Sequence, residues 1–185
     1  MHGMPRWLGA ITLTAALAAC SGAPTVYNTQ VYHDAWPTFF SGSGQSEFLA
    51  VVWGNPFNAE QARTDAVVLK SVDQAFNRAN YTFSTNPTNV DPLVPYVAVL
   101  FNPNSVSSGL PCSDLTALQP PRAASGEVRV HAALCRGGAP LTGARGFVAE
   151  VSDPNDPRFE KLMYQIAVEL FRYQPGTNPT GNVPS

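Results

Sequence analysis

Two histidines, His33 and His131, are the side chains of this sequence best suited to acid–base chemistry or metal binding near neutral pH. Asp34 directly follows the first of them. Neither histidine belongs to an H-x-x-x-H sequence, the spacing with which one helix binds a metal. His131 falls on the polar side of an alternating stretch. We therefore expect it to be solvated or hydrogen-bonded rather than catalytic.

The other residues that could carry chemistry are explained more simply by structure. Ser43 lies in Ser-Gly-Ser-Gly, without the strand-to-helix context of a G-x-S-x-G nucleophile. Lys70 and Lys161 both fall in predicted helices, and no phosphate-binding glycine loop occurs. Asp153 and Asp156 each precede a proline, as helix N-caps do. The sequence therefore predicts no catalytic residue, no metal site and no cofactor, and we do not expect an enzyme.

The composition favours long fixed loops around one core. Charged residues make up 13% of the chain, against about 25% in an average soluble protein. The chain has 17 prolines in 185 residues, nearly twice the usual share of about 5%. The formal net charge is −2, and the basic residues are isolated arginines and lysines. This pattern disfavours nucleic-acid binding.

The N-terminal region has the layout of a secretory signal peptide. A single basic residue, Arg6, precedes a mainly apolar run over 7–19. The run is shorter than the roughly 20 residues that a membrane-spanning helix needs. It ends in Leu17-Ala18-Ala19-Cys20, followed by Ser21. This segment resembles the lipobox of bacterial lipoproteins; the alternative is a cytosolic protein with an apolar N-terminal helix and a chance cysteine.

The resemblance to lipoproteins implies an address in the cell envelope. It implies removal of a signal peptide, residues 1–19, a diacylglycerol thioether on Cys20, and acylation of the new N-terminus, for example with palmitate. Several acyl chains hold a protein stably on a membrane. Ser21, which is not aspartate, favours the outer membrane over the inner one, with the domain facing the periplasm.

Two cysteines remain once Cys20 is assigned to lipid. Cys112 and Cys135 form an even pair, and in an oxidising compartment such a pair most often forms a disulfide. The alternative is a metal site, but neither cysteine has a C-x-x-C partner or a nearby histidine. We therefore predict a Cys112–Cys135 disulfide.

Apolar runs and helical spacing predict a single domain over 46–173. The runs 48–53 and 96–101 are predicted to be buried strands, and the segment 81–83 an edge strand. The stretch 127–135 alternates, with Glu127, Arg129, His131 and Ala133 on a solvated face, and 146–151 is predicted to pair with it.

Two amphipathic helices are predicted. The first covers 59–78, with Asn58 as N-cap and Ala62, Ala66, Leu69, Val72 and Phe76 on its apolar face. The second follows Asp153 and Asp156 and buries Phe159, Leu162, Met163, Ile166, Leu170 and Phe171.

These elements predict the α+β class, with a mixed four- to five-stranded sheet and both helices packed on one face. Residues 20–45 are expected to be a lipidated tether and N-terminal extension, of which 21–30 is flexible linker. The aromatic residues between 31 and 45 are expected to pack onto the domain. Residues 174–185 have the composition of a disordered tail.

The strand at 48–53 with the Gly54-Asn55-Pro56-Phe57 turn, together with the closing Leu170-Phe171, resembles a set of small, uncharacterised proteobacterial lipoproteins. The turn stands where α/β units often bind ligands, but it lacks the glycines of a phosphate cradle. We expect a non-catalytic, lipid-anchored binding or accessory domain, with the membrane and an envelope protein as partners. The alternative is a periplasmic enzyme or small-ligand binder that uses His33, Asp34 or His131.

Overall fold

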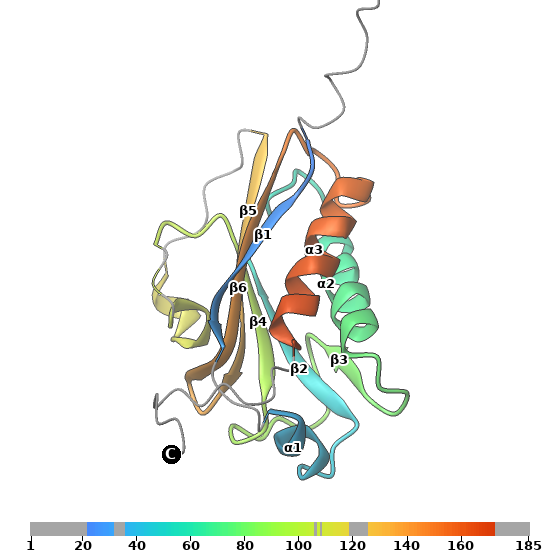
Figure 1. Ribbon diagram of the computed structural model, residues 1–185, viewed down its shortest axis with the longest axis vertical. Helices are drawn as coiled ribbons and strands as arrows, with labels where there is room; N and C mark the ends of the chain where they lie inside the picture. Colours follow the sequence, from blue (N-terminus) through green and yellow to red (C-terminus); the bar gives the residue numbers. More distant parts are fainter. Residues whose placement is uncertain (1–21, 32–35, 106, 108, 119–125, 173–185) are drawn as a thin grey trace, which may run out of the picture.

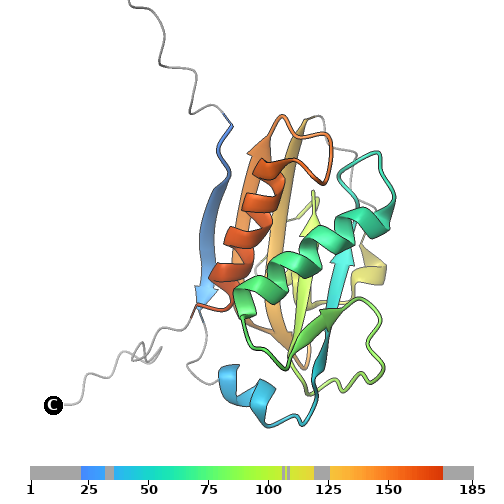
Figure 2. The same ribbon diagram turned by 90° about the vertical axis from the view of Figure 1, so that its right-hand side faces the viewer.

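Figure 1 shows the computed structural model, which describes residues 22–31, 36–105, 107, 109–118 and 126–172. A mixed six-stranded sheet has the strand order β1-β6-β5-β4-β2-β3. Helices α2 and α3 lie side by side on one of its faces (Figures 1 and 2). The predicted α+β class is confirmed, with six strands instead of four or five. The strands are β1 (Thr25–Val31), β2 (Glu47–Trp53), β3 (Thr82–Ser84), β4 (Tyr96–Phe101), β5 (Glu127–Arg136) and β6 (Ala139–Ala149). The helices are α1 (Trp36–Ser41), α2 (Gln61–Phe76) and α3 (Pro157–Leu170), with short 3-10 turns η1 (Leu110–Cys112) and η2 (Leu115–Ala117).

The middle of the sheet consists of the continuous apolar runs. β2 pairs in parallel with β4 on one side and with β3 on the other. β4, β5, β6 and β1 then pair antiparallel in succession. Five of the six residues of β4 are buried, because α2 and α3 cover one face and the segment after β4 covers the other. This explains why β4 is apolar throughout instead of alternating.

Helix α3 follows its sequence signals closely. Asp156 is the N-cap, and its carboxylate accepts a hydrogen bond of 2.8 Å from the backbone N–H of Arg158. Pro157 occupies the first helical position, where its missing N–H has no cost. The apolar face predicted for this helix is confirmed, since all six of its members are buried. Among the described residues, no helix is long and apolar enough to span a membrane.

Helix α2 forms where predicted, but its buried stripe is rotated. Ala62 and Ala66 are exposed, whereas the hydroxyl residues Thr64 and Ser71 are buried. Both hydroxyls donate hydrogen bonds, to the side chain of Asn55 at 3.1 Å and to the carbonyl of Val67 at 2.8 Å, so their burial leaves no unpaired donor. The stripe is made of Thr64, Val67, Val68, Ser71, Val72 and Phe76.

The start of α2 also differs from the expectation. The N-cap is Glu60, which makes no side-chain capping hydrogen bond, and not Asn58. Asn55 organises the turn instead, because its amide bonds the carbonyl of Ala59 at 2.7 Å and its oxygen accepts from the N–H of Phe57 at 3.0 Å. The Gly54–Phe57 segment is therefore explained as a structural turn.

The segment expected to be a flexible linker contains β1. Residues 25–31 pair antiparallel with β6 and form one edge of the sheet. Two glycines of β6 allow this approach. A Cβ on Gly146 would lie 2.7 Å from the carbonyl oxygen of Thr25, and a Cβ on Gly143 would lie 2.7 Å from the hydroxyl of Thr29. The linker prediction for 21–30 is therefore wrong over these residues, because backbone pairing orders a segment with few core-forming side chains.

Helix α1 closes the lower end of the core in Figure 2. Phe40 is fully buried, and its ring lies 4.7 Å from that of Phe48 and 4.8 Å from that of Phe76, measured between ring centroids. Phe83 and Phe171 complete this aromatic cluster. The prediction that aromatic residues of 31–45 pack onto the domain is confirmed for Phe40.

The opposite face of the sheet is covered only in part. Cys112 in η1 is joined to Cys135 in β5, which confirms the predicted disulfide. The bond holds η1 over a small apolar cluster that contains Leu100 and Ala133. Ala133 is therefore buried, and the solvated face predicted for β5 is present only at Glu127 and Arg129. Beside this covered part, the strands β5, β6 and β1 leave an open pocket.

Candidate functional site

A row of polar side chains crosses the open part of the sheet. The strand register places Tyr27 of β1 opposite Arg145 of β6, and Arg145 opposite His131 of β5. Because paired residues in antiparallel strands point to the same face, the three side chains lie next to one another. They lie on the face away from the helices. Gly146, the residue after Arg145 in β6, faces Leu162 of α3, and successive residues of a strand point to opposite faces.

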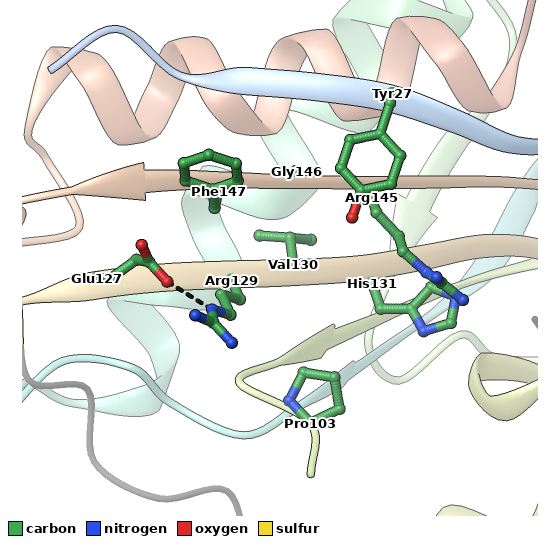
Figure 3. Close-up of a pocket in the computed structure, with 9 residues that line it drawn as sticks. All are labelled: Tyr27, Pro103, Glu127, Arg129, Val130, His131, Arg145, Gly146 and Phe147. Atoms are coloured by element: carbon green, nitrogen blue, oxygen red, sulfur yellow. Dashed lines mark hydrogen bonds and ion pairs between the residues drawn. The ribbon is translucent and has the colours of Figure 1, made fainter. Parts of the chain in front are cut away.

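A second row lies two pairs further along, on the same face of the sheet. Phe147 of β6 is paired with Arg129 of β5, and Arg129 forms an ion pair with Glu127 two residues before it. Figure 3 shows these side chains beside the first row. Together the two rows enclose a pocket of about 300 Å³ that Pro103 borders on the β4 side. Its lining residues are Tyr27, Pro103, Glu127, Arg129, Val130, His131, Arg145, Gly146 and Phe147.

The turn after β4 positions the Pro103 side of the pocket. Asn102 adopts a left-handed backbone conformation with φ of 46°, which asparagine tolerates better than most residues. Its side-chain oxygen accepts a hydrogen bond of 2.8 Å from the N–H of Arg129, and its own N–H donates to the carbonyl of Arg129 at 2.9 Å. These two bonds fix Pro103 relative to the backbone of Arg129.

His131 is the most unusual side chain in the pocket. It is 1% exposed, and neither ring nitrogen has a hydrogen-bond partner within the described part of the chain. Burial, and to a smaller extent the positive charge of Arg145, lower the pKa of His131 from 6.5 to about 4. The imidazole is therefore neutral at pH 7, with one nitrogen able to donate a hydrogen bond and the other able to accept one.

The walls of the pocket are aromatic and accessible. Tyr27 is 50% exposed and Phe147 is 39% exposed. Figure 3 shows the ring of Tyr27 reaching from β1 over β6 on the same side as His131 and Arg145. Exposed rings beside cationic side chains can stack on a flat ligand while the cations bind its polar atoms.

Sequence reasoning identified one residue of this pocket, His131, but expected it on a solvated face. His33, Asp34 and the lipidation candidate Cys20 lie outside the described residues. Tyr27 and Arg145 were missed, because the sequence predicts a tether over 21–30 and a strand only from 146 onward. Phe147 lies inside that predicted strand, but nothing in its local pattern marks it as part of a site. The signal for Arg145 and Phe147 is their alternation around Gly146, which places both side chains on the same face of a strand.

The carboxylates considered for chemistry have structural roles. Asp156 caps α3, and the hydrogen bond from the side chain of Arg158 lowers the pKa of Asp156. Asp153 accepts from the N–H of Asn155 at 2.8 Å and pairs with Arg63 of α2, and the backbone hydrogen bond contributes most to its lowered pKa. No cluster of three or more potential metal ligands occurs among the residues described here.

Comparison with known proteins leaves the family open. The sequence matches no protein-family profile and no curated protein. A solved structure with a similar arrangement is a dodecameric point variant of PelC from Paraburkholderia phytofirmans, which is 12% identical. The alignment covers 82% of this chain and 99% of that chain with a TM-score of 0.42. A likeness this weak carries no argument about function.

Proposed function

We propose that this protein is a lipid-anchored, non-catalytic binding or accessory domain of the cell envelope, attached through Cys20 and facing the periplasm. The observation that carries the proposal is the lipobox-like Leu17-Ala18-Ala19-Cys20 in the same chain as a Cys112–Cys135 disulfide. Disulfides form and persist in oxidising compartments, to which a lipoprotein signal peptide would deliver the chain. The residue after the cysteine, Ser21, favours the outer membrane.

The position of β1 gives this anchor a short reach. Only residues 21–24 separate Cys20 from Thr25, the first residue of β1. At roughly 3.3 Å per residue, those four residues extend over about 13 Å. Gly22 lies beside Arg158 at the beginning of α3, because a Cβ on it would be 3.0 Å from the guanidinium. The anchor would therefore hold this end of the domain against the bilayer.

The pocket supports a binding role over a catalytic one. Its lining residues include no serine, threonine, cysteine or lysine that His131 could activate as a nucleophile. An envelope protein is the partner we propose, as for other accessory domains held at a membrane. Cross-linking in intact cells followed by purification would test this role, and the absence of any reproducible envelope partner would contradict it.

Mass spectrometry of the membrane fraction tests the anchor itself. The wild-type chain should give an N-terminal peptide that begins at Cys20 and carries diacylglycerol and an acyl group. The Cys20→Ser variant should lose this peptide and leave the membrane fraction. An intact peptide beginning at Met1, with free thiols at Cys112 and Cys135, would contradict the proposal.

A small-ligand binder that uses His131 is the second candidate. The observation that favours it is the buried imidazole of His131 at the edge of an open pocket, whose ring nitrogens have no hydrogen-bond partner among the described residues. This candidate is compatible with lipid anchoring, because the anchor fixes the location and the pocket supplies the ligand site.

A further inference from the structure

We propose that a groove at the beginning of β2 and β4 binds a neutral saccharide of at least two sugar rings. The groove consists of two adjoining hollows that share Gln45 and Asn89 as lining residues. It has no lining residue in common with the pocket between β1, β6 and β5. The inference goes beyond the proposed role in the cell envelope and does not depend on the lipid anchor.

The pairing of β2 with β4 places the groove. The two strands are parallel and directly paired, so the segments that lead into them meet at the same end of the sheet. These segments are 44–46 before β2 and 88–95 before β4. Figure 1 shows α1 and the beginning of β2 at this end, and the beginning of β1 at the other. In a chain anchored through Cys20, the groove would therefore lie at the end of the domain away from the membrane.

Hydrogen bonds hold the loop between β3 and β4 in place. The carboxylate of Glu47 in β2 accepts from the N–H of Thr88 at 3.0 Å and from its hydroxyl at 3.2 Å. At the end of β5, Nε of Arg136 donates to the carbonyl of Leu93 at 2.7 Å. The loop is thus fixed to strands on both sides, and a ligand would bind a wall that is already ordered.

One hollow offers neutral hydrogen-bonding groups. Its volume is about 280 Å³. The side-chain amides of Gln45 and Asn89 form no hydrogen bond to other described residues, and neither residue is buried. Each amide can both donate and accept hydrogen bonds, as the hydroxyl groups of a sugar do. These accessible amides therefore match a ligand rich in hydroxyl groups. The hollow is lined by Gly44, Gln45, Ser46, Glu47, Thr88 and Asn89.

The other hollow, of about 190 Å³, offers an apolar wall. Tyr96 lines it and packs half-buried against the apolar cluster under η1. Leu49 and the 62% exposed Val90 add apolar surface. The hydroxyl of Tyr96 forms no hydrogen bond to other described residues, so this side chain presents an apolar ring and a polar end. A sugar ring, which has an apolar C–H face beside its hydroxyl groups, can contact both.

The charge of the groove favours a neutral ligand. Glu47 and Asp91 are its charged lining residues, and no basic residue of the described chain lines either hollow. Two carboxylates repel an anion. Both already accept hydrogen bonds from backbone N–H groups, those of Thr88 and Leu93, so neither needs a cationic ligand as a partner.

The size of the groove favours more than one sugar ring. Pockets that bind small molecules usually measure about 300 to 1,000 Å³. The hollows of about 190 and 280 Å³ reach this range only together. A ligand that uses both Tyr96 and the amide of Gln45 therefore extends across the two hollows.

Nuclear magnetic resonance of the isotope-labelled full chain provides the test, in a detergent without a sugar headgroup. The probes are cellobiose, lactose, maltose and N,N′-diacetylchitobiose at millimolar concentration. We expect at least one of them to shift the side-chain amide signals of Gln45 and Asn89. Glucose should bind at least about tenfold more weakly, because it fills one hollow only. If no disaccharide of this set shifts these signals, or if glucose binds equally well, the proposal is overturned.

Tetraproline tests the competing ligand class, an extended peptide that packs on the ring of Tyr96. It offers apolar rings but no hydroxyl groups. We expect it to bind more weakly than the best disaccharide, because it leaves the amides of Gln45 and Asn89 without partners. Tighter binding of tetraproline would make the groove a peptide site and overturn the saccharide proposal.

Substitutions in one loop locate the site. Asn89→Ala should weaken binding of the responding disaccharide by about threefold to tenfold, because it removes hydrogen bonds to the ligand. Asn89 is exposed and its side chain bonds no other described residue, so the fold should stay intact. Tyr96→Leu should weaken binding by a similar factor, because leucine keeps apolar volume but lacks the flat ring.

Asn86→Ala is the matched control. Asn86 is an exposed asparagine of the same loop that lines neither hollow, so its replacement should leave the affinity unchanged. Equal affinities of the Asn89→Ala and Asn86→Ala variants would place the saccharide elsewhere and overturn the proposal.

Discussion

The two faces of the sheet are covered in different ways. On the helix face, α2 and α3 bury one continuous apolar cluster that runs from Phe40 at one end to Phe159 at the other. On the opposite face, a five-residue cluster lies under η1, which the Cys112–Cys135 disulfide joins to β5. The cover ends there, and the neighbouring strands β5, β6 and β1 present Arg129 and the rings of Tyr27 and Phe147 to solvent, with His131 buried beside them.

The two faces of the sheet therefore differ in how much of their surface stays accessible. The helix face is stabilised by the apolar area that α2 and α3 bury against the sheet. The opposite face is held by a covalent bond and needs less apolar cover, so part of it stays open.

The helix face should respond most strongly to truncation. Phe159 is fully buried and packs edge-on against Phe57, with ring centroids 4.8 Å apart. Phe159→Ala should lower the free energy of unfolding by about 3 to 5 kcal/mol, because it leaves a cavity in the main core. Denaturant unfolding measures the change. Tyr164→Ala, at a 45% exposed position of the same helix, should change the stability by less than about 0.5 kcal/mol, and equal effects would contradict the assignment.

The free energy of unfolding should also depend on the disulfide that covers the opposite face of the sheet. Replacing Cys112 and Cys135 together with alanine opens a cross-link over a sequence separation of 23 residues. The chain-entropy relation gives a loss of about 3 kcal/mol in unfolding free energy. Thermal or denaturant unfolding should show the double variant and the chemically reduced wild type to be equally destabilised. An unchanged midpoint in both would show that apolar packing alone holds η1.

His131 should make the stability depend on pH. Its pKa is about 4 in the folded chain and about 6.5 when unfolded, so only the unfolded state takes up this proton between those values. The free energy of unfolding should therefore rise with pH over this window and fall by on the order of 3 kcal/mol as pH drops from 6.5 to 4. In His131→Leu this part of the profile should be flat. Parallel profiles for the two proteins, measured by denaturant unfolding, would contradict the buried neutral state.

The pairing of β1 with β6, which forms one edge of the pocket, should depend on the absence of a side chain at Gly146. An alanine Cβ there would lie 2.7 Å from the carbonyl oxygen of Thr25 and 2.8 Å from a methyl group of Leu162. Gly146→Ala should cost about 1 to 3 kcal/mol and weaken the β1–β6 pairing, which hydrogen exchange of the β1 amides measures. Gly109→Ala is the control, because no atom lies within 4 Å of the position its Cβ would take. Equal protection of β1 in both variants would contradict this role.

Several elements were predictable because their signals are local. α3 has its cap, its proline and its apolar face within one stretch of sequence, and the structure agrees on each. The run that forms β4 is apolar because both of its faces are covered, whereas in β2 only Phe48 and Ala50 are buried and the other residues are half-buried. The disulfide was predictable because only Cys112 and Cys135 are left to pair when Cys20 is assigned to lipid.

Other elements were not predictable because their partners are distant in the sequence. The stripe of α2 includes Thr64, whose burial depends on a hydrogen bond to Asn55 that helical spacing does not reveal. β1 contains few core-forming residues, and its order comes from backbone pairing with a strand more than a hundred positions later.

Local patterns in the chain were enough to predict the class of fold, the positions of the main helices and the Cys112–Cys135 disulfide, and they carry the resemblance of the N-terminal region to lipoproteins. Each of these depends on neighbouring residues or on a count. The pocket depends on pairings between strands that are distant in the sequence. His131 lies between Leu100 of β4 and Arg145 of β6, and its lowered pKa follows mainly from its burial there. An alternating strand has the same pattern whether its second face meets water or protein, so the sequence pattern alone does not show which part of that face stays open.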